Sequence, residues 1–174
     1  EAYEHFYRMT VTGEEINLTP ILEQVNQVVV ANPDRAHAVF LRGLFYVVKA
    51  DMGRATSQDV RLGLNDLDRT LELNPDHDLA RLFRAFLRIR AGRPARASRD
   101  LDLVRKRLPD NPFVDYVRAL ASIARDDPEQ AIAALKTAWS KGFRAYHRVR
   151  RLADRSEAVA DDPWIAEVLE RSEE

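Results

Sequence analysis

Apolar residues recur along most of this chain at the three- and four-residue spacing of an amphipathic helix, and turn signals separate the helical stretches. An early stretch begins at the start signal Thr19-Pro20, ends before Pro33 and contains the apolar residues Ile21, Leu22, Val25, Val28 and Val29. Gly92-Arg93-Pro94 and Asp126-Asp127-Pro128 mark two later turns, and each proline suits the first position of a following helix. The pattern predicts an all-α chain of roughly nine to ten helices.

Small residues and prolines repeat along the chain with a fixed period. Pro75 and Pro109 each precede an aspartate and lie 34 residues apart. Small residues recur in step with them, as Gly43, Ala85 and Ala119 in the first helix of each unit and as Gly63, Ala97 and Ala131 in the second. Small residues are expected where two helices touch, and such helix pairs bury their apolar faces by stacking on one another. The period therefore predicts a helical repeat array with an extended surface for a partner.

These positions resemble those of the tetratricopeptide repeat family. The strings Leu41-Arg42-Gly43-Leu44-Phe45-Tyr46 and Leu73-Asn74-Pro75-Asp76 carry the likeness, and Leu67, Leu101 and Leu135 recur where that family places an aromatic residue or leucine. The likeness covers residues 34–143, although Phe143 stands where a third proline is due. It implies an α-solenoid, wound as a right-handed superhelix, that binds other proteins.

The repeat register divides the chain into five segments. They are N-terminal helices of an incomplete repeat (1–33, with Tyr3, Phe6 and Tyr7 in its first helix), repeat 1 (34–75), repeat 2 (76–109), repeat 3 (110–143) and C-terminal capping helices (144–174) of the kind that closes bacterial arrays. Repeat 1 has 42 residues, so about eight are inserted relative to the 34-residue period. We place the insert at Met52–Asp59, as a longer turn between the two helices.

Catalysis is not indicated by any motif in the chain. The four histidines (His5, His37, His77 and His147) fall in different units, and none is paired at the spacing of a helical metal site. There is no phosphate-binding glycine loop and no nucleophile elbow. We therefore predict a protein that is not an enzyme and that has no cofactor and no metal.

Basic charge is concentrated in the middle of the sequence, although the whole chain has a net charge of −1. Residues 81–151 hold 18 basic and 7 acidic residues, whereas the flanking segments 1–80 and 152–174 each have a net charge of −6. Arg93, Arg96 and Arg99 represent this basic surface, which suits an acidic protein segment or, alternatively, nucleic acid. Protein is favoured because no aromatic residue is interleaved at a spacing suited to base stacking. Arginine outnumbers lysine 23 to 4, so a genomic preference for arginine codons explains part of the cluster.

The tetratricopeptide resemblance also implies a concave groove lined by the first helix of each unit. The residues that it places there and that we predict to bind a partner are His37, Phe40, Leu44, Leu79, Leu82, Phe86, Arg90, Phe113, Tyr116 and Leu120. This lining is apolar and lacks the Lys, Asn and Arg pattern of a chaperone-tail clamp. Arg81 and Arg88 stand where the family usually has aromatic residues. Two interpretations follow. In the first, the apolar stripe packs inward as part of the core. In the second, which is favoured, the groove is covered by a partner, an absent domain, the N-terminal segment or a second copy of the chain.

The leading functional prediction is a protein-interaction module or scaffold that docks a partner segment through the groove, with the basic surface attracting acidic residues. Binding of nucleic acid or another polyanion is the first alternative, and a regulatory C-terminal domain of a larger enzyme is the second. Self-association is a further mode of partner binding. No membrane span or secretory leader is evident, which favours a cytoplasmic location. Glu1 in place of a methionine suggests a processed or excised fragment.

Overall fold

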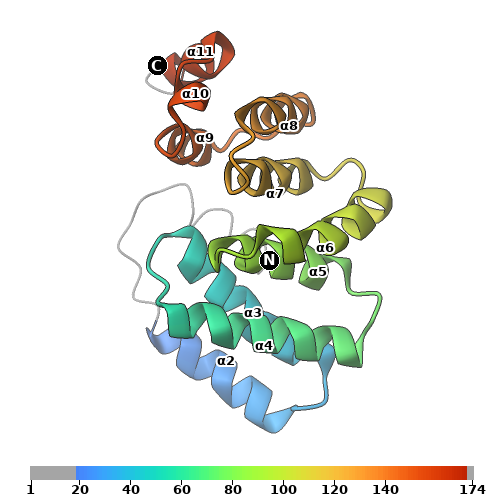
Figure 1. The fold of residues 1–174 in the computed structure, drawn as a ribbon. Helices are drawn as coiled ribbons and strands as arrows, with labels where there is room; N and C mark the ends of the chain where they lie inside the picture. Colours follow the sequence, from blue (N-terminus) through green and yellow to red (C-terminus); the bar gives the residue numbers. More distant parts are fainter. Residues whose placement is uncertain (1–18, 172–174) are drawn as a thin grey trace. The chain divides into compact units, whose positions relative to one another are not determined.

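The computed structural model describes residues 19–171, and all regular secondary structure in that range is α-helical (Figure 1). Its ten helices are α2 (Thr19–Ala31), α3 (Ala36–Asp51), α4 (Ser57–Leu73), α5 (Asp78–Arg90), α6 (Pro94–Arg107), α7 (Pro112–Ile123), α8 (Pro128–Ser140), α9 (Tyr146–Ala153), α10 (Glu157–Ala160) and α11 (Pro163–Glu170). The predicted all-α class is confirmed. The helix expected around Tyr3, Phe6 and Tyr7, and the processed start at Glu1, lie outside the described residues.

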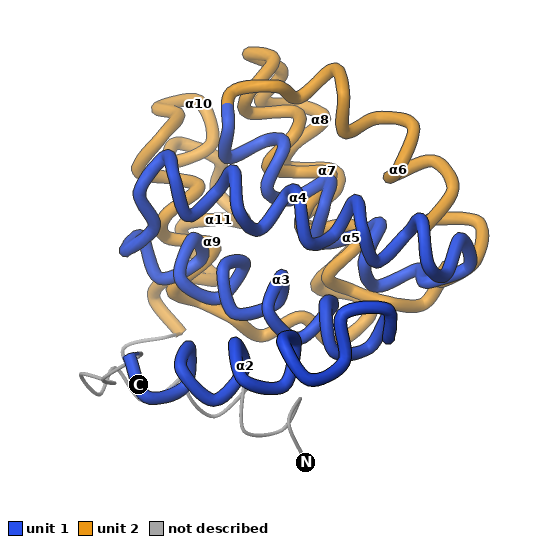
Figure 2. The backbone as a smooth tube through the Cα atoms, turned by 90° about the horizontal axis from the view of Figure 1, so that it is seen from below, with its two compact units in different colours: residues 1–91 blue, residues 92–174 orange. Residues whose placement is uncertain are grey.

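The chain separates into two compact units, residues 1–91 and residues 92–174, which Figure 2 colours blue and orange. The boundary falls in the turn between α5 and α6, and so inside the predicted repeat 2 (76–109). The repeat boundaries themselves stay predictions.

In the first unit, α3 packs against α2, α4 and α5, and α4 also packs against α5. The close approach of these helices depends on glycine at two points. A Cβ atom on Gly43 would lie 3.0 Å from Leu67 Cδ2, and a Cβ atom on Gly63 would lie 2.8 Å from Tyr46 Cβ. The prediction that small residues mark helix contacts is thus confirmed at both positions, since an added Cβ would crowd the neighbouring helix.

The eight residues inserted in repeat 1 are not confined to the turn where the sequence placed them. Helix α3 has 16 residues against 13 in α5, and α4 has 17 against 14 in α6. The turn at 52–56 is also two residues longer than the turn at 91–93. Two antiparallel helices that lengthen by the same amount keep their contact along the added turn, and the extra residues therefore extend the α3–α4 pair.

Helix α4 begins earlier than predicted because Thr56 and Asp59 form a reciprocal capping box. The backbone N–H of Asp59 donates to Thr56 Oγ1 at 3.2 Å, and the backbone N–H of Thr56 donates to Asp59 Oδ2 at 2.7 Å. Burial alone raises the pKa of Asp59, but hydrogen bonds from Lys49 and Thr56 outweigh it, so the pKa lies below its ordinary value. The cap fixes residues 57–59 in the helix and not in the turn.

In the second unit, α7 pairs with α6 and α8, and α9, α10 and α11 follow, with α10 also against α8. Four of the helices in this unit have proline at their first position, namely Pro94, Pro112, Pro128 and Pro163. The predicted helix starts at Pro94 and Pro128 are confirmed. Trp139 of α8 meets Trp164 of α11 edge to face at 5.9 Å, and Ile165 and Val168 are buried.

Candidate partner-binding surface

The residues predicted to line the groove divide into buried and accessible groups. The buried ones have exposed fractions of 1–6% and are Phe40, Leu82, Phe86, Tyr116 and Leu120. Half-buried ones are Leu44, Leu79, Arg90 and Phe113, whereas His37 is exposed. The structure therefore leaves only the second group open to a partner, and whether those residues bind one stays a prediction.

Aromatic contacts explain the burial of Phe40 in the first unit. Its ring centroid lies 4.3 Å from that of His77 and 6.1 Å from that of Phe83. Phe40 belongs to α3 and Phe83 to α5, so the apolar stripes of these two helices meet between them. At this point the apolar stripe packs inward, which the sequence analysis had ranked second.

The loop after α8 covers the corresponding ring in the second unit. The ring of Phe143, in that loop, stacks on Tyr116 of α7 at 5.0 Å, and Phe113 lies 5.5 Å from Tyr116. The guanidinium of Arg148 is placed 5.2 Å from the centroid of the Phe113 ring. Phe143 stands where the repeat pattern calls for proline, and its ring is used to cover α7.

Three arginines of α5 are paired with aspartates within the first unit. Arg81 pairs with Asp78 at 3.2 Å and Arg84 with Asp68 at 2.8 Å, while Arg88 lies 3.7 Å from the same Asp68 carboxylate. These side chains are at most 23% exposed. Although α5 contributes much of the basic charge seen in the sequence, it presents little of that charge to solvent.

Helix α6 differs from α5, because its basic side chains all reach solvent. The exposed basic residues at and along this helix, called here the α6 basic surface, are Arg93, Arg96, Arg99, Arg105, Lys106 and Arg107. Arg93, Arg99, Arg105 and Lys106 form no ion pair with any residue in 19–171. Of the two acidic residues in the helix, Asp100 is buried and Asp102 is exposed. The three predicted arginines are thus exposed, and their role in binding a partner stays a prediction.

An arginine that was not among the predicted site residues recurs at one repeat position. Arg84 and Arg118 lie 34 residues apart, and Arg42 precedes Arg84 by 42, the length of the extended repeat 1. Each is paired with an aspartate: Arg42 with Asp66, Arg84 with Asp68, and Arg118 with Asp115. Arg42 holds Asp66 through two bonds of 2.7 and 2.8 Å, and this hydrogen bonding raises the pKa of Arg42. The spacing was readable in the sequence, but the partner aspartates follow no common offset.

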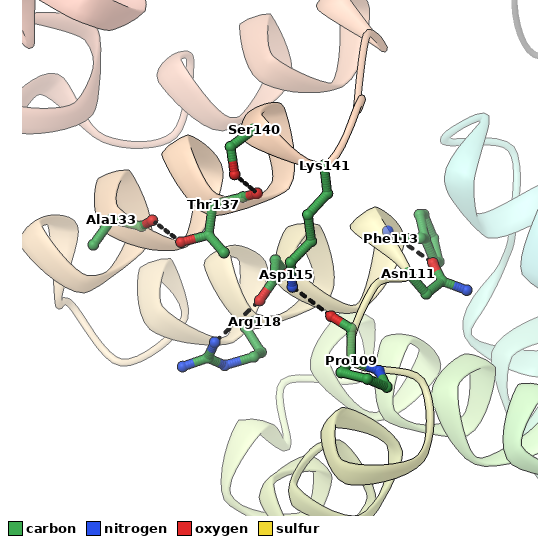
Figure 3. Close-up of polar contacts among 9 residues, drawn as sticks. All are labelled: Pro109, Asn111, Phe113, Asp115, Arg118, Ala133, Thr137, Ser140 and Lys141. Atoms are coloured by element: carbon green, nitrogen blue, oxygen red, sulfur yellow. Dashed lines mark hydrogen bonds and ion pairs between the residues drawn. The ribbon is translucent and has the colours of Figure 1, made fainter.

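Asp115 is the centre of a buried polar cluster at the start of α7 (Figure 3). Its carboxylate accepts from Lys141 Nζ at 2.6 Å and from Arg118 Nη1 at 3.1 Å. Lys141, which caps the end of α8, also donates to the backbone carbonyl of Pro109 at 2.6 Å. The cluster ties α7, α8 and the preceding turn together, and its charges are used inside the unit, which marks it as structural.

Among residues 19–171, no group of three or more histidine and acidic side chains is arranged to hold a metal ion. Within the same range, no helix combines the length and apolar character needed to cross a membrane.

Comparison with known proteins gives matches only at the level of structure. Neither protein-family models nor curated protein sequences match the chain. A MamA double mutant of strain RS-1 superposes with a TM-score of 0.64 and 17% identity over 98% of this chain and 96% of that one. MamA 41-end from Desulfovibrio magneticus RS-1 superposes with a TM-score of 0.64 and 18% identity, over 98% of this chain and 93% of that one. A tetratricopeptide repeat protein from Parabacteroides merdae superposes with a TM-score of 0.61 and 19% identity, over 90% of this chain and 65% of that one. The chain therefore has a tetratricopeptide-type helical-repeat fold, as predicted.

Proposed function

We propose that this protein is an interaction module that binds an acidic segment of a partner protein, with the α6 basic surface as its main docking site. The observation that carries the proposal is the contrast between two consecutive basic helices. The arginines Arg81, Arg84 and Arg88 of α5 are held by aspartates, whereas the basic side chains of α6 are exposed. Exposed charge attracts an oppositely charged partner and speeds its association.

The fold supports a binding role, because stacked helix pairs offer an extended surface to a partner. The half-buried side chain of Phe113, which lies in the same unit as α6, would add an apolar contact to the partner. Apolar contacts of this kind usually contribute affinity, whereas rim charges contribute attraction and specificity.

Nucleic acid is the second candidate, since clustered arginine and lysine also bind phosphates. The α6 basic surface fits it less well. Residues 93–107 contain no aromatic side chain on which a base could stack.

The test is capture of partners from nuclease-treated extracts of the source cell by immobilised protein. Wild type is compared with a variant carrying Arg93→Glu, Arg96→Glu and Arg99→Glu, and with a control carrying Arg35→Glu, Arg61→Glu and Arg155→Glu, three exposed arginines outside α6. The two variants have the same net charge. We expect wild type and control to retain the same proteins and to release them as salt rises, and the α6 variant to retain none.

Two results would contradict the proposal. Retention that is seen only when the nuclease treatment is omitted would identify nucleic acid as the ligand. Equal retention by the α6 variant would place the docking site elsewhere, and Leu44→Ala with Leu79→Ala would then test the accessible part of the predicted groove.

A further inference from the structure

The outward face of α6 carries a stripe with a regular spacing. Arg96, Arg99, Leu103 and Lys106 are all exposed, and they follow one another at intervals of three, four and three residues. This is the spacing of the contact positions in a heptad repeat, which keeps side chains in line along one face of a helix. The buried residues Ala97, Leu101 and Val104 lie on the opposite face. The stripe is thus aligned along the helix and points away from the core.

Leu103 is the unusual member of the stripe. Its exposed fraction is 39%, and the other large hydrophobic residues in 19–171 with comparable exposure are Val28, Val30 and Leu62. Leu103 lies between cations, with Arg99 one turn before it and Lys106 nearly one turn after it. A nucleic-acid backbone gains nothing from a leucine at the centre of its site, whereas an apolar side chain of a partner helix gains by covering it.

Charge complementarity limits the partner further. Carboxylates that flank an apolar seam would meet Arg96, Arg99 and Lys106, which lie along about 15 Å of helix at a rise of about 1.5 Å per residue. Asp102 stands on one flank of the stripe and is exposed. It would repel a carboxylate on that side, and so would favour one orientation of the partner.

We propose that the partner segment is an acidic amphipathic helix that lies along α6, with an apolar side chain on Leu103 and carboxylates on Arg99 and Lys106. The inference rests on the proposed function. It adds that the bound segment is helical and that an apolar side chain of this helix contacts Leu103. An extended acidic segment and a phosphate backbone are the outcomes that the test must separate from it.

The experiment titrates the full chain with two fluorescent synthetic peptides of roughly 20 residues, long enough to form a helix. Both contain the same numbers of leucine, glutamate and alanine residues. In the first, leucine occupies the contact positions of a heptad repeat, and in the second the order is scrambled so that no apolar seam forms. We expect the first peptide to bind about tenfold more tightly or better, equivalent to about 1.4 kcal/mol. Leu103→Ala should remove most of this preference, and Leu62→Ala, at a matched exposed leucine in α4, should leave it unchanged.

Each outcome decides a separate question. Equal binding of both peptides, lost in Arg99→Glu with Lys106→Glu, would overturn the helical partner and leave the acidic partner intact. A preference that survives Leu103→Ala would place the helix elsewhere than on α6. Absence of binding by either peptide would contradict the proposed function itself, and binding of a single-stranded RNA oligonucleotide in their place would assign the surface to phosphate.

Discussion

Arg84 donates a hydrogen bond to Asp68 across 2.8 Å, from the first helix of one predicted repeat to the second helix of the repeat before it. Arg88 lies 3.7 Å from the same carboxylate. One aspartate therefore lies within ion-pair distance of two arginines that the sequence counts toward a basic cluster. Local charge along a chain predicts surface charge only where the fold supplies no partner, and for this reason α6, rather than α5, is the candidate docking helix.

Gly63 is predicted to be more sensitive to substitution than Gly43, although both lie at helix contacts. Alanine favours a helix interior over glycine by about 1 kcal/mol. At Gly43 the new methyl meets the end of the Leu67 side chain at 3.0 Å, which can rotate away, so we expect Gly43→Ala to change the free energy of unfolding by less than about 1 kcal/mol. At Gly63 it meets Tyr46 Cβ, which is fixed to the backbone, at 2.8 Å.

Gly63→Ala should therefore destabilise the protein by roughly 1–3 kcal/mol in urea unfolding. Equal stability of the two variants would contradict the close approach of α3 and α4 described above.

Lys141 should stabilise the second unit through Asp115. Lys141→Met keeps the length and apolar stem of the side chain but removes one of the two cations around a carboxylate that is 2% exposed. We expect a loss of about 1–3 kcal/mol, because a buried carboxylate left short of partners retains its desolvation cost. Arg171→Met, which removes an exposed pair with Glu167, is the matched control and should cost about half a kcal/mol or less. Urea unfolding of both variants measures the difference. If Lys141→Met left the free energy of unfolding unchanged, Arg118 alone would be a sufficient partner for the Asp115 carboxylate.

His77 should make the start of α5 sensitive to acid. Its Nδ1 accepts from the backbone N–H of Ala80 at 3.2 Å, so the cap requires the neutral imidazole. Burial lowers the pKa of His77 below its ordinary value of 6.5. Between the folded and unfolded pKa values the unfolded chain binds more protons, so stability falls as pH drops below about 6.5. The lowered pKa of Asp59 adds a loss only below its ordinary value of 3.8.

The variant His77→Asn separates the cap from its titration, since asparagine caps helices without a charge change. Urea midpoints at about pH 7.5 and about pH 5 should fall further for wild type than for His77→Asn. The same decrease in both proteins would mean that His77 is not the group responsible.

The close approach of α3 and α4 was predictable because it depends on residue size. Gly43 and Gly63 lie at contacts where an added Cβ would crowd a neighbouring helix, and small residues at these two positions are visible in the sequence. The longer α3–α4 pair was not predicted, although the capping box of Thr56 and Asp59 marked the start of α4.

The candidate site was less predictable. Helical spacing shows that Phe40 belongs to an apolar stripe, but the contact with His77, 37 residues further along the chain, decides that the stripe is buried. In the same way, nothing local to Arg84 shows that it pairs with Asp68, whereas Arg99 has no acidic partner among residues 19–171. Contacts between distant residues therefore decided which predicted residues reach the surface.

The most direct test of the acidic-partner proposal is a titration of the protein with poly-L-glutamate and with single-stranded RNA, measured by calorimetry at an ionic strength of about 0.15 M. We predict that wild type binds poly-L-glutamate, that Arg99→Glu with Lys106→Glu abolishes the binding, and that the control Arg35→Glu with Arg155→Glu preserves it. Tighter binding of RNA than of poly-L-glutamate by wild type, or poly-L-glutamate binding that survives the α6 substitutions, would contradict the proposal.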